Sequence, residues 1–134
     1  MDNIEMTFTQ NDISTTLVEA TTVLAENLVQ SEPFLHFQEA ARKLQADHEA
    51  MRLLNEFEDL QQRIRTQQLS NTISENDLKR IRELQLEIGM NDVIQEHSLA
   101  QEMATAFLRE VNQEISNLIG IDFASLTRRS GGCC

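Results

Sequence analysis

The feature that most limits the fold of this chain is the near absence of residues that break an α-helix. The 134 residues contain one proline and four glycines, so long stretches run without an interruption to helical backbone. Tryptophan and tyrosine, which favour strands, are absent. We therefore predict an all-α fold, an antiparallel bundle of about five helices in one domain.

Apolar residues recur at helical spacing, and polar capping residues separate the successive segments. Asn11 or Asp12 is expected to cap the start of the first helix. The sequence Ser31-Glu32-Pro33 then predicts a break and a restart, because serine caps a helix and proline is tolerated in a first turn. The second helix is expected to end near Ala46.

Two further helices are expected to form a projecting hairpin. Asp47 can cap a third helix that extends to roughly Leu69. Ser74 opens a fourth helix with a pattern that resembles a capping box, and Gly89 is a natural residue to follow its end.

The last helix is long for a chain of this size. It is expected to start at Asn91 or Asp92 and to end near Gly120, which makes it about 42 Å long at ~1.5 Å per residue. A compact monomer would not cover an apolar stripe of that length, so we expect a second copy to pack against it in a dimer. The candidate partner-binding residues are those late in this helix and just after it: Phe107, Val111, Ile115, Leu118, Phe123 and Leu126.

The chain divides into three parts on this interpretation. Residues 1–10 form a flexible N-terminus, residues 11–122 the helical domain, and residues 123–134 a flexible tail that ends in Cys133 and Cys134.

The charge of the chain is strongly negative and unevenly placed. The net charge is −11, and no lysine or arginine precedes Arg42. Nucleic-acid binding needs a cationic footprint, so direct binding of DNA or RNA is disfavoured. One local exception flanks the expected hairpin turn, and we interpret it as a solvated helix face rather than a phosphate-contacting patch. Its members are Arg63, Arg65, Lys79, Arg80 and Arg82.

The sequence predicts neither a membrane protein nor a secreted one. No apolar run approaches the ~20 residues that a membrane-spanning helix needs, and no basic stretch followed by an apolar one marks a secretory signal. We therefore expect a cytoplasmic protein.

Motifs for catalysis are not found, and we predict that the protein is not an enzyme. His48-Glu49-Ala50-Met51-Arg52 begins like the zinc-binding pattern H-E-x-x-H, but Arg52 occupies the second histidine position. The Glu-x-x-His pattern of carboxylate-bridged metal bundles is missing as well.

Cys133 and Cys134 are the two cysteines of the chain, and they follow the pair Gly131-Gly132. Two thiolates supply at most half of a four-ligand metal or cluster site, so a second copy or a partner would have to supply the rest. The alternative is a tail whose thiols have no ligand. The residues alone leave both interpretations open.

The chain resembles the YlbF/YmcA family of small helical bacterial regulators. The resemblance runs from about Leu24 to the C-terminus and rests on Ser31-Glu32-Pro33-Phe34, a helix that opens at Asp47, and Asn91-Asp92-Val93 before the long helix. Phe123-Ala124-Ser125-Leu126 and the terminal cysteines resemble the end of YlbF-type members with a cysteine-rich extension.

The resemblance implies a regulatory protein that acts by assembly with other proteins. It implies the YlbF subunit of a complex with YmcA- and YaaT-like proteins, which modulates mRNA processing by the endoribonuclease RNase Y and thereby competence, sporulation and biofilm formation. It also implies a 4Fe-4S iron–sulfur cluster shared with partner subunits, although this chain has two adjacent cysteines where those members have several spaced ones. The alternatives are an iron–sulfur or metal-dependent redox sensor and a cluster-free paralogue of the YmcA or YheA type.

Overall fold

The computed structural model of the chain describes residues 14–122 and Ser125. This part of the chain contains five α-helices and no strand, which confirms the predicted all-α fold. The helices are α1 (Thr15–Gln30), α2 (Glu32–Ala46), α3 (His48–Leu69), α4 (Glu75–Met90) and α5 (Asp92–Ile119).

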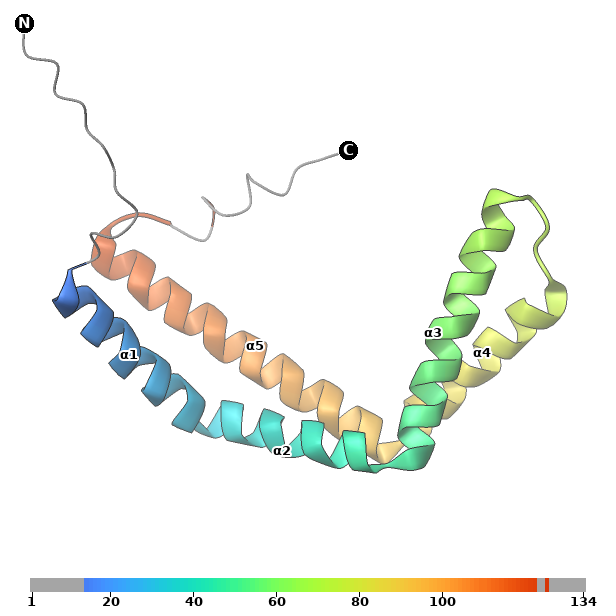
Figure 1. The fold of residues 1–134 in the computed structure, drawn as a ribbon, viewed down its shortest axis with the longest axis horizontal. Helices are drawn as coiled ribbons and strands as arrows, with labels where there is room; N and C mark the ends of the chain where they lie inside the picture. The colour runs from blue at the N-terminus through green and yellow to red at the C-terminus, as the bar shows by residue number, and fades with distance from the viewer. Residues whose placement is uncertain (1–13, 123–124, 126–134) are drawn as a thin grey trace, which may run out of the picture.

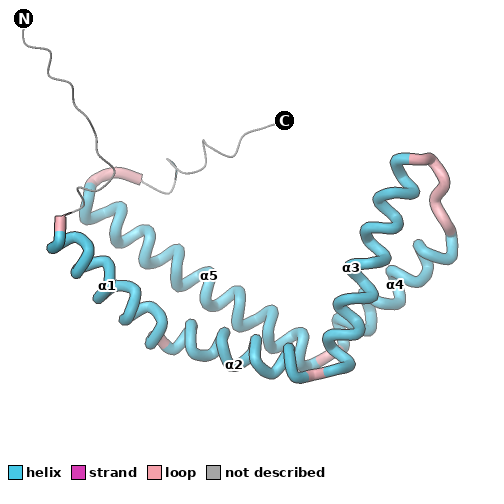
Figure 2. The backbone as a smooth tube through the Cα atoms, viewed as in Figure 1, coloured by secondary structure: helices cyan, strands magenta, loops and turns pink. Residues whose placement is uncertain are grey.

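The five helices form two parts that meet at an angle (Figure 1). In one part, which we call the arm, α1 and α2 follow one another along α5 and run antiparallel to it. In the other, which we call the hairpin, α3 and α4 pack against each other and project away from the arm. Figure 2 shows that short loops join the helices on both sides of this corner. The predicted projecting hairpin is therefore confirmed.

Side-chain caps fix the starts of four helices. In each case a side-chain oxygen accepts a hydrogen bond from the backbone N–H three residues later, which satisfies a donor that has no partner within the helix. The N···O distances are 3.2, 2.8, 3.4 and 3.0 Å for Ser14, Asp47, Ser74 and Asn91, respectively. Asp47 and Ser74 were expected, and Asn91 is one of the two caps expected for the last helix. For α1 the structure corrects the prediction, because the cap is Ser14, whereas Asn11 and Asp12 lie outside the described residues.

The junction of α1 and α2 lies where the sequence predicts it, but Ser31 acts differently. Its hydroxyl donates to the backbone carbonyl of Leu28 at 2.6 Å and makes no capping bond to α2. Ser31 therefore satisfies an acceptor at the end of α1. Pro33 lies in the first turn of α2, where no backbone donor is needed.

Two glycines, near the ends of α4 and α5, differ in backbone conformation. The prediction that Gly89 follows the end of α4 is wrong: it lies inside the helix, which continues to Met90 because Asn91 both ends α4 and caps α5. Gly120 follows α5 as predicted, with a φ of 74° in the left-handed region that favours glycine.

Alanine substitutions at these two glycines are expected to have opposite effects. Gly89→Ala should raise the free energy of unfolding by roughly 0.5–1 kcal/mol, since a Cβ at this position has nothing within 4 Å. Gly120→Ala should lower it by about 1 kcal/mol, because the added Cβ strains a left-handed residue. Urea unfolding followed by circular dichroism compares the two. Equal effects would show that backbone conformation does not distinguish these sites.

The hydrophobic core lies in the hairpin and at the corner. Its buried cluster comes from α2, α3, α4 and α5 and consists of Leu44, Ala50, Leu53, Leu60, Ile64, Leu84 and Ile94. The arm differs, because its buried residues other than Leu44 and Ile94 at the corner are small: Ala40, Ala100, Ala104 and Ser116. These alanines let α2 and α5 approach closely, but α1 has no buried residue at all. The arm therefore lacks a core of large side chains.

Candidate protein-binding surface

Large apolar side chains that remain exposed are concentrated on the arm. Single exposed apolar residues are normal on a protein surface, but an entire helix without one buried residue is not. In α1 all of the following are at least 40% exposed: Leu17, Val18, Val23, Leu24 and Val29. In α5 the exposed set is Leu99, Met103, Leu108, Leu118 and Ile119.

Helical spacing makes the α1 residues a continuous stripe. Leu17 and Leu24 are seven residues apart and share one face, while Val18, Ala25 and Val29 share the adjoining face. All five are exposed in the chain as it stands. We call this set the α1 stripe. It is the pattern of a helix that packs against another apolar surface.

A hollow lies beside the α1–α2 junction. It is an open cavity of about 580 Å³, with apolar lining from Pro33, Leu35 and Met103 and polar lining from Gln30, Glu32 and His36. Because Met103 belongs to α5, the hollow is lined by side chains from both of the helical layers that make up the arm, α1 and α2 on one side and α5 on the other.

The structure places four of the predicted partner-binding residues together on α5. Phe107, Val111 and Ile115 are half-buried, and Leu118 is 84% exposed. Their spacing of three or four residues puts them on one face of the helix. The residue furthest from the corner is thus the most exposed, which agrees with a stripe that the arm covers only in part.

Four other predicted site residues lie outside the described part of the chain: Phe123, Leu126, Cys133 and Cys134. The sequence shows an apolar stripe on α1, but partner binding was assigned to the last helix and the tail and not to this stripe. A signal was present: Val18 and Val23 widen the apolar arc of α1 beyond what one neighbouring helix covers.

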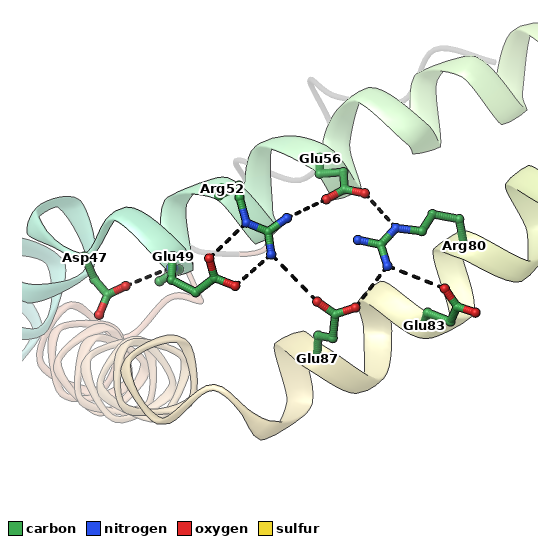
Figure 3. A network of polar contacts seen from close by, with 8 residues as sticks. Asp47, Glu49, Arg52, Glu56, Arg80, Glu83 and Glu87 are labelled. Atoms are coloured by element: carbon green, nitrogen blue, oxygen red, sulfur yellow. Dashed lines mark hydrogen bonds and ion pairs between the residues drawn. The ribbon is translucent and has the colours of Figure 1, made fainter.

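A ring of alternating charges joins the two helices of the hairpin (Figure 3). Glu56 of α3 accepts hydrogen bonds from Arg52 at 2.9 Å and from Arg80 of α4 at 2.7 Å. Glu87 of α4 accepts from Arg80 at 3.0 Å and lies 3.8 Å from Arg52, which closes the ring. The hairpin is therefore cross-linked by polar contacts on its surface as well as by its core.

The ring predicts that acid weakens the hairpin. The hydrogen bond from Arg80 lowers the pKa of the Glu56 carboxyl below its ordinary value. A carboxyl whose pKa is lower in the folded chain than in the unfolded chain stabilises the fold at neutral pH, and this contribution is lost as the pH falls through the folded-state pKa. Glu56→Gln should remove that part of the pH dependence in urea unfolding, whereas Glu58→Gln, an exposed neighbour outside the ring, should retain it.

The basic residues of the hairpin mostly contact carboxylates of the hairpin itself. Arg63 pairs with Asp77 at 3.1 Å, Lys79 lies 3.9 Å from Glu83, and Arg80 belongs to the ring. This is the arrangement expected of a solvated, salt-bridged helix face, the interpretation preferred from the sequence.

The described residues offer no metal centre of their own. Within residues 14–122 and Ser125, no group of three or more His, Cys, Asp and Glu side chains could hold a metal ion. No helix in the same residues is long and apolar enough to cross a membrane. Cys133 and Cys134 fall outside this region, and by count they supply two of the four ligands that a zinc or iron–sulfur site needs.

The fold and the exposed arm define a small all-α protein suited to association with other proteins. A family model described as control of the competence regulator ComK, YlbF/YmcA, matches residues 17–119. The chain belongs to this family, as its sequence resemblance predicts.

A solved structure supports the fold assignment. The chain is similar to a chain in the crystal structure of Bacillus subtilis RicA in complex with RicF, with a TM-score of 0.72 and 24% sequence identity. The similarity covers 81% of this chain and 96% of that one. Comparison with curated proteins finds no match.

Proposed function

We propose that the protein is a non-enzymatic regulatory adaptor that acts by assembling with other proteins through its arm. The observation that carries this proposal is α1, a helix of 16 residues with no buried residue and an exposed apolar stripe. Burial of apolar surface yields roughly 25 cal/mol per Å², so a partner that covers this stripe gains binding free energy.

Family membership favours a regulatory role for this surface. The family is described by its control of a competence regulator, and the similar solved structure is that of Bacillus subtilis RicA in complex with RicF. By this analogy the protein is a subunit of a complex with YmcA- and YaaT-like proteins. That complex modulates RNase Y-dependent mRNA processing in the cytoplasm and, through it, competence, sporulation and biofilm formation.

Sedimentation velocity tests the proposal. The full chain is run alone and mixed with the YmcA- and YaaT-like proteins of its host, and we expect a larger species that contains all added subunits. Leu118→Glu should reduce that species, whereas Leu86→Glu, on the exposed face of α4, should leave it unchanged. Failure of the mixture to form any larger species would overturn the proposal.

The tail adds a separate proposal about a cofactor. Two cysteines do not complete a four-ligand site, so Cys133 and Cys134 would bind an iron–sulfur cluster together with ligands from the assembled subunits. Anaerobic purification of the complex should then yield bound iron that the variant Cys133→Ser/Cys134→Ser lacks. Equal iron content in the two preparations would exclude these thiols as ligands.

A further inference from the structure

We infer that the arm binds a partner whose apolar helical surface is bordered by lysine and arginine, rather than a second copy of this chain. The inference rests on the proposed function and specifies the chemistry of the occupant. It is carried by the separation of charge between the arm and the hairpin.

Acidic residues with few basic neighbours surround the outer part of the arm, residues 15–38 and 103–119. This region carries five glutamates and one arginine. The hairpin, residues 48–90, carries eight acidic and six basic residues, and many of these pair with one another. The negative charge of the hairpin is thus largely balanced locally, whereas that of the outer arm is not.

The glutamates of α1 border the exposed apolar residues on the side of the valines, away from Leu17 and Leu24. In α1, Glu26 lies one helical turn from Val29, and Glu19 lies one turn from Val23. In α5, Glu114 lies one turn from Leu118. The three carboxylates are exposed, and the ion pairs of the described residues involve α2 to α5 but not α1. The apolar surface therefore has an acidic rim.

The acidic rim distinguishes between the molecules that could cover the arm. A symmetric dimer through the arm would place two such rims against each other, and like charges juxtaposed across an interface are unfavourable. Nucleic acid and anionic lipid are disfavoured for the same reason. A protein with an apolar helical stripe and a rim of lysine and arginine satisfies both the apolar surface and its border.

Two synthetic helical peptides provide the test. Both have the same stripe of leucine and valine; one has lysine and arginine along its borders, and the other has glutamate. Fluorescence anisotropy with the full-length protein at low salt should show the basic peptide binding at least about tenfold more tightly. High salt should reduce the difference, because it screens exposed charges.

Charge reversal on the protein separates the rim from the apolar surface. Glu19→Lys/Glu26→Lys should invert the preference between the peptides, and the matched variant Glu58→Lys/Asp59→Lys on α3 should preserve it. Equal binding of both peptides, or no binding of either, would overturn the inference. So would a salt-independent homodimer that Leu24→Glu dissociates. Equal binding that is lost in Leu17→Ser/Leu24→Ser would still support the proposed function while removing the role of the rim.

Discussion

Replacing Leu84 with alanine is expected to lower the free energy of unfolding by about 3 kcal/mol. Leu84 is the largest side chain with less than 2% exposure, and it lies in the cluster that joins the hairpin to the arm. Its truncation removes apolar contacts and leaves a cavity that neighbouring helices fill only in part.

The nearby residue Leu86 provides the control for Leu84. It is on the same helix but 67% exposed, so Leu86→Ala should change the free energy of unfolding by less than about 0.5 kcal/mol. Urea unfolding monitored by circular dichroism measures both. Similar losses in the two variants would contradict the position of the core in the hairpin and at the corner.

The double substitution Leu17→Ser/Leu24→Ser is expected to weaken binding of the partner by about a hundredfold while the fold is retained. Full burial of a leucine side chain contributes roughly 1.5–3 kcal/mol relative to leaving it exposed, and a hundredfold change in affinity corresponds to about 2.7 kcal/mol. Because α1 buries none of its residues in the free chain, the same change should have little effect on folding.

Leu69→Ser is the matched control for the arm variant. Leu69 is 88% exposed at the end of α3 in the hairpin, so it tests whether any exposed leucine would have the same effect. Isothermal titration with the purified partner complex measures affinity, and circular dichroism checks folding. A comparable loss of affinity in Leu69→Ser would place the binding surface on the hairpin instead.

Local chemistry explains which parts of the fold could be predicted from the sequence. Asp47, Ser74 and Asn91 act as caps because their short polar side chains reach a backbone donor three residues ahead, a relation within one helical turn. The scarcity of glycine and proline similarly predicted long helices. These features depend on neighbours in the sequence, so tertiary context changed them little.

The errors arise where two local solutions compete or where a distant partner decides. Ser31 has two backbone groups within reach, and its hydroxyl binds the Leu28 carbonyl instead of capping α2. Gly89 can end a helix, but the cap at Asn91 determines where α4 stops.

The exposed apolar surface of the arm was anticipated only in part for a similar reason. An amphipathic stripe shows that a helix packs against something, but it does not say whether the neighbour is in the same chain. The apolar pattern led to the expectation that α5 is incompletely covered, but it did not show that the apolar residues of α1 are uncovered too, because only the packed structure shows that α1 has no buried residue. Domain boundaries and the cofactor ligands stay predictions.

Hydrogen exchange of the α1 amides, with and without the partner, tests the central claim most directly. In the free chain these amides should exchange much faster than those of α3, because few buried contacts oppose local opening of α1. Addition of the YmcA- and YaaT-like partners should slow exchange in α1 and in the second half of α5. Protection confined to the hairpin, with α1 exchange unchanged in the complex, would contradict the assignment of the arm as the binding surface.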